Sequence, residues 1–287
     1  MTTDEAYAAC ARVAGGHYEN FPVASLLLPP PMRPHIAAIY AFARAADDFA
    51  DEGDRPAVDR LRLLDDWQAR LTACAAGSGG DDPVFVALGE TIRTCGLPIG
   101  LFEDLLSAFR QDVTTTRYAT WDDVIDYCRR SANPVGRLVL RVAGCADGRL
   151  DAASDAVCTA LQLTNFWQDL GRDWHKGRIY VPRETLDRTG ASERDLDART
   201  ITPAWREALA DMAARTRALF DAGRPVCDGV SGRLRYELRF TWLGGRRILD
   251  RLEEAGFDVF TARPTLGAAD VAGLAWRALA WPSGGAA

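Results

Sequence analysis

A chain of 287 residues with a net charge of −6 and three histidines lacks the basic surface on which non-specific nucleic-acid binding depends. Its 48% apolar and 26% charged residues are typical of a soluble globular protein with a sizeable core. We therefore expect no nucleic-acid partner, whereas an anionic substrate stays compatible because bound metal ions can reverse the local field.

The seven cysteines are dispersed singly, without a Cys-x-x-Cys pair or a Cys/His cluster. This spacing argues against a zinc site and fits a reducing cytosol. The N-terminus lacks a basic region followed by an apolar run, and no stretch of about 18 apolar residues occurs, so neither a signal peptide nor a membrane-spanning helix is predicted. We expect a cytoplasmic protein.

Helical periodicity dominates the chain, and alternating β-branched runs are almost absent. The pattern predicts helices at 3–15, 33–52, 56–76, 83–94, 98–110, 121–130, 134–146, 151–173, 203–223, 231–255 and 268–280. Thr120 has the character of an N-cap, and the polar stretch 182–202 is expected to be a long loop with a short helix. Because no break resembles a linker, we predict one all-α domain over 1–287, a bundle with its site between facing helices.

The helix expected at 33–52 carries a polar stripe at steps of three and four residues: Tyr40, Arg44, Asp47 or Asp48, and Asp51. Carboxylates gathered on an apolar helix are costly without a cation, and Mg²⁺ is a suitable one. Arg44 lies one turn before the carboxylates and is placed to reach a diphosphate. The alternative is a solvated face with an intrahelical Arg–Asp pair.

A second polar stripe follows at 160–174, with the same spacing: Gln162, Asn165, Asp169 and Asp173. Apolar residues surround it, so this helix should be largely buried and its amides and carboxylates need partners. Mg²⁺ with its waters is one partner, and an internal hydrogen-bond network is the alternative. Lys176 and Arg178, just beyond, either bind phosphate oxygens or are ordinary surface charges.

The stretch 271–281 is apolar and rich in tryptophan, but it is short and Arg277 interrupts it. It is either a last helix docked on the core or a contact with the surface of the inner membrane.

The two acidic motifs, about 120 residues apart, are expected to face one another. Together with nearby basic residues they form the arrangement needed for metal-assisted departure of a diphosphate, because the ions neutralise charge that develops on the leaving group.

In its motifs and their order the chain resembles the squalene/phytoene synthase family. The matching segments are 17–21, 26–29, 40–44, the first acidic motif, Tyr127-Cys128, Val135-Gly136, the second acidic motif and 177–182. The resemblance implies an all-α isoprenoid-synthase fold and three Mg²⁺ that bridge the aspartates to a prenyl diphosphate. It also implies a carbocation sheltered in an apolar cavity, with Tyr180 among the residues that bind substrate.

Two segments depart from members that couple two prenyl diphosphates. Residues 127–136 read Tyr-Cys-Arg-Arg-Ser-Ala-Asn-Pro-Val-Gly, and Phe166-Trp167-Gln168 stands where two aliphatic residues and an arginine are usual. These variants resemble the bacterial hydroxysqualene synthase branch of hopanoid pathways. That branch implies ionisation of presqualene diphosphate, rearrangement of the cation and capture by water.

A water admitted to a dry cavity needs polar partners. We favour Asn133, with Tyr127 nearby, and count Ser131, Asn165 and Gln168 among the candidate polar groups. The alternative for Asn133 is an N-cap of a helix that starts at Pro134. Four aromatic residues are candidates to stabilise the cation through their ring faces, or are simply core: Phe21, Phe166, Trp167 and Trp242.

Two further hypotheses stay open. In the first, the chain is a prenyltransferase that joins two prenyl diphosphates head to head to make presqualene diphosphate or phytoene-type products. In the second, it is a non-catalytic helical scaffold. Loss of one aspartate pair would be expected of a scaffold, and both pairs are present. The expected partners are a lipidic prenyl diphosphate, neighbouring enzymes of the pathway and, peripherally, a membrane.

Overall fold

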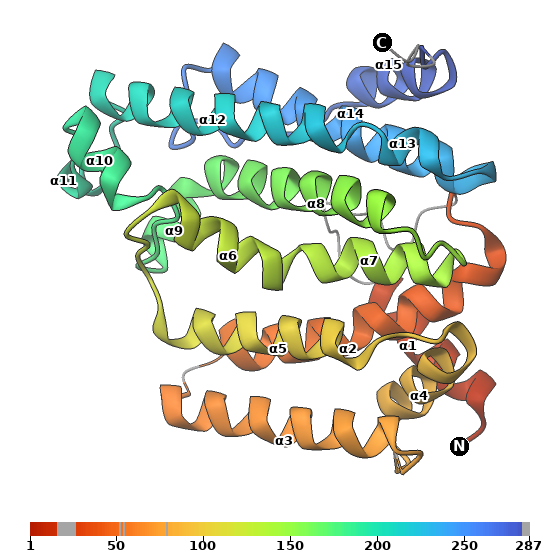
Figure 1. Cartoon of the computed structure of the whole chain (residues 1–287). Helices are drawn as coiled ribbons and strands as arrows, with labels where there is room; N and C mark the ends of the chain where they lie inside the picture. The colour runs from red at the N-terminus through yellow and green to blue at the C-terminus, as the bar shows by residue number, and fades with distance from the viewer. Residues whose placement is uncertain (16–26, 52, 54, 79, 283–287) are drawn as a thin grey trace. The chain divides into compact units, whose positions relative to one another are not determined.

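The computed structural model describes residues 1–15, 27–51, 53, 55–78 and 80–282, and this part of the chain contains helices and no strand. The predicted all-α class is confirmed (Figure 1). The helices are α1 (Thr3–Gly15), η1 (Pro30–Met32), α2 (Arg33–Asp51), α3 (Ala57–Ala75), α4 (Pro83–Cys95), α5 (Ile99–Thr114), α6 (Trp121–Ser131), α7 (Asn133–Val142), α8 (Gly148–Gln168), α9 (Leu170–His175), α10 (Arg183–Thr189), α11 (Glu193–Asp197), α12 (Pro203–Gly223), α13 (Val226–Gly229), α14 (Gly232–Glu254) and α15 (Ala268–Leu279).

Helix α2 is the centre of a first compact unit, which comprises residues 1–115 and 130–151. Where α1, α2 and α4 meet, the buried side chains are small: Ala6, Cys10, Ala37, Ala38, Ala41 and Ala87. On another side of α2 the Phe42 ring lies 5.8 Å from Trp67 and 5.4 Å from Phe102, centroid to centroid. Small contacts on one side and aromatic contacts on the other fix how α2 is rotated.

A triangle of hydrogen bonds ties α1, α2 and α4 together. Tyr7 Oη lies 3.2 Å from His35 Nδ1 and 3.0 Å from Thr91 Oγ1, and His35 Nδ1 lies 3.1 Å from Thr91 Oγ1. Burial lowers the pKa of His35 below its ordinary value of 6.5, because the neutral ring is favoured there.

A pH titration of stability tests this triangle. Because the folded-state pKa of His35 is depressed, its contribution is present above pH 6.5 and is lost as the pH falls through the folded pKa. In urea unfolding between pH 5 and 7.5, His35→Gln should therefore lose less stability on acidification than the wild type. Equal pH slopes for the two proteins would show that His35 does not titrate in this way.

A second compact unit comprises residues 116–129 and 152–287. Its helices α8, α12 and α14 come close at two glycines. A Cβ on Gly223 would lie 2.5 Å from Val157 Cγ2, and a Cβ on Gly245 would lie 2.5 Å from the Phe220 ring and 2.7 Å from Leu161 Cδ2. At both positions glycine is required because the helices pack closely there, and not because the backbone turns.

Most predicted helices are found with ends within one residue of those expected. The expected cap at Thr120 is present, since Thr120 Oγ1 accepts from Asp123 N and Asp123 returns a bond to Thr120 N. Helix α7 ends at Val142, earlier than predicted, because Gly144 adopts φ 75° and Cys145 N bonds to Leu140 O.

Helix α5 runs on to Thr114 where an end at 110 was predicted, and α8 begins at Gly148 where 151 was predicted. Three further predictions about elements were wrong. The helix expected over 151–173 stops at Gln168, and Asp169, at φ −101° and ψ 10°, separates α8 from α9. The stretch 182–202 holds two short helices, α10 and α11, rather than one. Asn133 is not a cap: it is the first residue of α7, Ala132 precedes it as the N-cap, and no side-chain cap bond is made.

Helix α15 packs on α14 through Leu274 and Ala278, as expected of a last helix docked on the core. Trp276 and Leu279 are 70% and 64% exposed. No helix in the described ranges is both long enough and apolar enough to cross a membrane.

Candidate functional site

The first acidic motif lies in the last turns of α2 and is held by its own arginine. Arg44 Nη1 lies 3.3 Å from Asp47 Oδ2, and Arg44 Nη2 forms an ion pair with Asp48 Oδ1 at 2.6 Å. The Asp47 and Asp48 side chains are 41% and 39% exposed. Tyr40 and Asp51 are half-buried on the same helix. The intrahelical Arg–Asp pairing of the alternative interpretation is therefore present in the ligand-free chain.

The second acidic motif spans the break between α8 and α9. The helical hydrogen bonds continue across it, from Asp169 N to Asn165 O and from Asp173 N to Asp169 O, both at 2.8 Å. The i, i+4 relation of Asp169 and Asp173 thus survives although the helix does not. Gln162 and Asn165 lie half-buried on α8, as the polar stripe predicts.

Arg263, which the sequence did not single out, binds Asp169 with both arms of its guanidinium. The distances are 2.6 Å from Nε to Oδ1 and 2.8 Å from Nη2 to Oδ2. Such a two-pronged contact is the strong form of an arginine–carboxylate pair. It joins residues 94 apart in the chain, so no local pattern announced it.

Gln168 and Gly171 make further contacts with the segment that contains Arg263. Gln168 Nε2 donates to Pro264 O at 2.5 Å, while its Oε1 is buried and accepts no hydrogen bond from the described residues. An unsatisfied buried acceptor costs about 1–3 kcal/mol. A Cβ on Gly171 would lie 3.2 Å from the Phe260 ring, so glycine allows the segment to lie close against α9. The segment that joins α14 to α15 thus covers the second acidic motif.

Arg117 fixes the loop that follows α9. It donates from Nη1 to Gly177 O at 2.6 Å and from Nε and Nη2 to the two oxygens of Glu193 at 2.8 and 3.0 Å. These hydrogen bonds lower the pKa of Glu193. Lys176 is exposed and Arg178 is half-buried on this loop, so the loop presents basic groups next to the second acidic motif.

Four aromatic rings of the second unit form a buried cluster: Tyr118, Tyr127, Phe166 and Tyr180. Phe166 and Tyr180 stack with centroids 3.6 Å apart and an interplanar angle of 1°. Tyr127 lies 6.0 Å from each of them. Three of the predicted site residues are therefore brought together, and Tyr118, in the turn before α6, joins them without a sequence signal.

The two tryptophans proposed as cation stabilisers pack as core residues. Trp167 is fully buried and its Nε1 donates to Thr216 Oγ1 at 2.9 Å. Trp242 Nε1 donates to Phe220 O at 2.7 Å. Asn133 is buried in the first turn of α7, and Phe21, with the rest of 17–21, lies outside the described residues.

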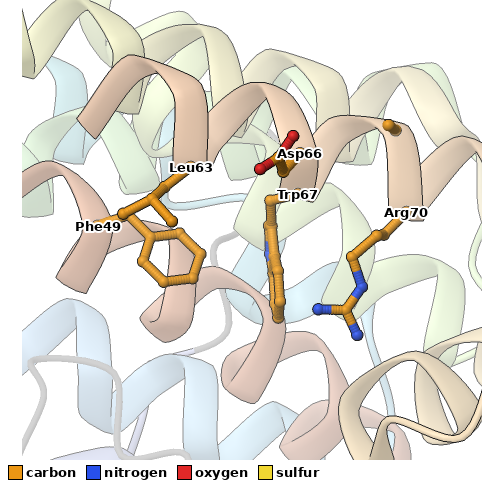
Figure 2. Close-up of a pocket in the computed structure, with 6 residues that line it drawn as sticks. Phe49, Leu63, Asp66, Trp67 and Arg70 are labelled. Atoms are coloured by element: carbon orange, nitrogen blue, oxygen red, sulfur yellow. The ribbon is translucent and has the colours of Figure 1, made fainter. Parts of the chain in front are cut away.

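A groove of about 510 Å³ opens between α2 and α3 (Figure 2). The aspartates of the first acidic motif do not line it. Phe49 lines it, together with Trp67 and Arg70. Because Phe49 is two residues from both Asp47 and Asp51, it projects from the opposite side of α2.

The carboxylates fit Mg²⁺ in its usual protein mode. Among the residues that the structure describes, no three acidic, histidine or cysteine side chains converge into a ready-made metal cage. Mg²⁺ commonly uses one or two carboxylates and completes its shell with phosphate oxygens and water. The pairs Asp47/Asp51 and Asp169/Asp173 offer such oxygens.

Comparison with known proteins assigns the chain to a family. The family model described as squalene/phytoene synthase matches residues 14–270. The chain belongs to the squalene/phytoene synthase family. Both acidic motifs, the cluster of four rings and the segment bearing Arg263 lie within the matched span, so the candidate site lies within the part of the chain shared with the family.

Relatives in this family include the hydroxysqualene synthase of Zymomonas mobilis subsp. mobilis, 44% identical over 74% of this chain and 71% of its own. The 15-cis-phytoene synthase of Synechococcus elongatus is 32% identical over 90% of this chain and 87% of its own. The solved structure of squalene synthase HpnC from Alicyclobacillus acidocaldarius has a TM-score of 0.83 and 43% identity, over 89% of this chain and 95% of that one.

Proposed function

We propose that the chain is a Mg²⁺-dependent carbon–oxygen lyase that converts presqualene diphosphate and water into hydroxysqualene and diphosphate, in squalene/hopanoid biosynthesis. The observation that carries this proposal is the similarity to a hydroxysqualene synthase at 44% identity, against 32% for a phytoene synthase. The departures at 127–134 and at Gln168 support it, because they replace aromatic, apolar and basic residues of coupling enzymes with polar ones.

In this proposal the aspartates bind the metal and the basic residues bind the leaving group. Asp47, Asp51, Asp169 and Asp173 supply the oxygens for about three Mg²⁺, and Asp48 assists through Arg44. Mg²⁺ supplies Lewis-acid stabilisation of the departing diphosphate. Arg44, Lys176 and Arg178 contact its oxygens, and Tyr40 and Gln162 orient it.

The carbon skeleton requires an environment of the opposite kind. Loss of diphosphate leaves a cation, for which an aromatic lining offers electron-rich faces without a nucleophile. The buried cluster that contains Tyr127, Phe166 and Tyr180 has this character. Asn133, Asn165 and Gln168 are the candidate polar groups to hold a single water.

Product analysis tests the proposal. The purified protein is incubated with presqualene diphosphate or farnesyl diphosphate, with Mg²⁺ or with EDTA, and the lipids are identified by mass spectrometry. We expect hydroxysqualene from presqualene diphosphate only, and only with Mg²⁺. Presqualene diphosphate formed from farnesyl diphosphate would contradict the proposal.

One specific observation favours a second candidate: the solved relative at 43% identity carries the name squalene synthase. Head-to-head coupling of two prenyl diphosphates is therefore the alternative, and the farnesyl diphosphate arm of the same experiment detects it. No turnover of either substrate would leave the helical scaffold as the explanation.

A further inference from the structure

The side-chain amide of Gln168 is buried. Its NH₂ group donates a hydrogen bond, whereas its oxygen accepts none from the described residues. The side chain is 4% exposed at the end of α8. Its partner, Pro264 O, is a carbonyl and can only accept, so the NH₂ group must face it, at 2.5 Å. The amide oxygen is thereby forced to the other side, where it is buried and receives no hydrogen bond from the described chain. The carbonyl partner, rather than the choice of side-chain rotamer, therefore leaves the amide oxygen of Gln168 without a hydrogen bond from the described residues.

The open acceptor lies beside the second acidic motif. Gln168 directly precedes Asp169, and on α8 it follows Asn165 by three residues, which places it at the edge of the polar stripe. Gln168 is held at Pro264 O, and in the ligand-free chain the neighbouring Arg263 holds Asp169 by two hydrogen bonds. Because Gln168 and Asp169 are adjacent in the chain, Oε1 lies close to a residue proposed to hold the metal.

We propose that Gln168 Oε1 accepts a hydrogen bond from the water molecule that captures the carbocation; this inference rests on the proposed function. An acceptor suits this task because the water uses an O–H group to reach it and keeps a lone pair free for attack. Satisfying the buried oxygen with a water also resolves the open acceptor, as ordered waters do in protein interiors.

The step balances as follows. The carbon–oxygen bond to diphosphate breaks and its electron pair leaves with the diphosphate. After the cation has rearranged, the lone pair of the held water forms the new carbon–oxygen bond. The resulting oxonium loses one proton to the released diphosphate, a base that the reaction itself supplies. Gln168 takes up no proton, since an amide oxygen is far too weak a base, and acts by fixing where the water waits.

The test is the product ratio of Gln168→Met, which keeps the length and approximate volume of the side chain but removes the amide. Presqualene diphosphate should still be consumed, slowed by less than tenfold. The ratio of hydroxysqualene to hydrocarbons formed by proton loss should fall at least tenfold. The matched control is Thr164→Val, one turn earlier on α8, whose hydroxyl is already satisfied by Ala160 O at 2.7 Å. Its product ratio should be that of the wild type.

The outcomes separate the two proposals. If Gln168→Met still makes mainly hydroxysqualene, the role of Gln168 is wrong and the proposed function stands. If the wild type makes no hydroxysqualene, both fail. Should the variant not fold, a crystal structure of the wild type with an uncleavable thio-diphosphate analogue decides. A water within hydrogen-bond distance of Gln168 Oε1 is expected, and a protein donor there would overturn the inference.

Discussion

Replacing Asp169 with asparagine should reduce turnover of presqualene diphosphate by at least about 100-fold, the upper range for loss of an outer partner of a metal ligand. The change removes one negative charge from the second acidic motif while keeping the volume of the side chain. It also converts the two-pronged acceptor of Arg263 into a group with a single acceptor oxygen. The loss of the negative charge weakens the proposed metal site.

The measurement is turnover across a Mg²⁺ titration, joined by a readout that needs no catalysis. A ligand that binds only the folded state at 100 times its dissociation constant stabilises it by about 2.7 kcal/mol. Mg²⁺ with inorganic diphosphate should therefore raise the melting temperature of the wild type, and much less that of Asp169→Asn.

Asp211→Asn is the matched control for Asp169→Asn. It removes an aspartate on α12 that pairs with Arg188 at 2.6 Å and lies outside the candidate site. Because a surface ion pair contributes about 0–1 kcal/mol, this variant should keep its activity and its response to Mg²⁺. Wild-type turnover in Asp169→Asn would remove Asp169 from the metal site.

A methyl group added at Gly223 should destabilise the protein by about 1–3 kcal/mol or more, the range for overpacking. The new Cβ would lie 2.7 Å from Ala153 O and 2.8 Å from Val157 N, both backbone atoms of α8. Backbone in a helix cannot yield as a flexible side chain does. The steric cost therefore outweighs the gain of about 1 kcal/mol that alanine brings to a helix.

Urea unfolding followed by circular dichroism measures this cost, and Gly100→Ala in α5 is its control. Nothing lies within 4 Å of a Cβ built on Gly100, so alanine there should be neutral or stabilising. A Gly223→Ala variant as stable as the wild type would mean that α8 and α12 do not pack as closely as the structure shows.

The helices were predictable because periodicity and caps are local signals. The N-cap residue Thr120 and the acidic first turn of α6 correctly predicted where this helix begins. The break at Asp169 could not be read in this way, because Leu-Gly-Arg-Asp continues a plausible helical pattern. What accompanies the break is a partner 94 residues away, Arg263, in a loop without periodicity. Asn133 misled the local rule, since the turn from α6 passes through Ala132 and already starts α7 at Asn133.

The site was predictable residue by residue but not as an arrangement. The family motifs pointed to Tyr127, Phe166 and Tyr180 separately, and only the structure shows that their rings form one cluster in which Phe166 and Tyr180 are stacked. Trp167 illustrates the limit, because its neighbour Phe166 faces the ring cluster whereas Trp167 turns to Thr216. Adjacent residues of an α-helix point about 100° apart, so Phe166 and Trp167 face different neighbours, and which of them lies at the site depends on distant helices.

The pairing of Arg263 with Asp169 makes cation uptake an exchange. The charge of the Asp169 carboxylate is already balanced by a guanidinium, so, if Asp169 holds Mg²⁺ as proposed, the incoming ion would displace a resident positive charge instead of filling an empty site. The measured affinity for Mg²⁺ is then a difference between two binding free energies. By reciprocity, a change that weakens the Arg263–Asp169 pair would strengthen the proposed Mg²⁺ binding, and bound Mg²⁺ would weaken that pair by the same free energy.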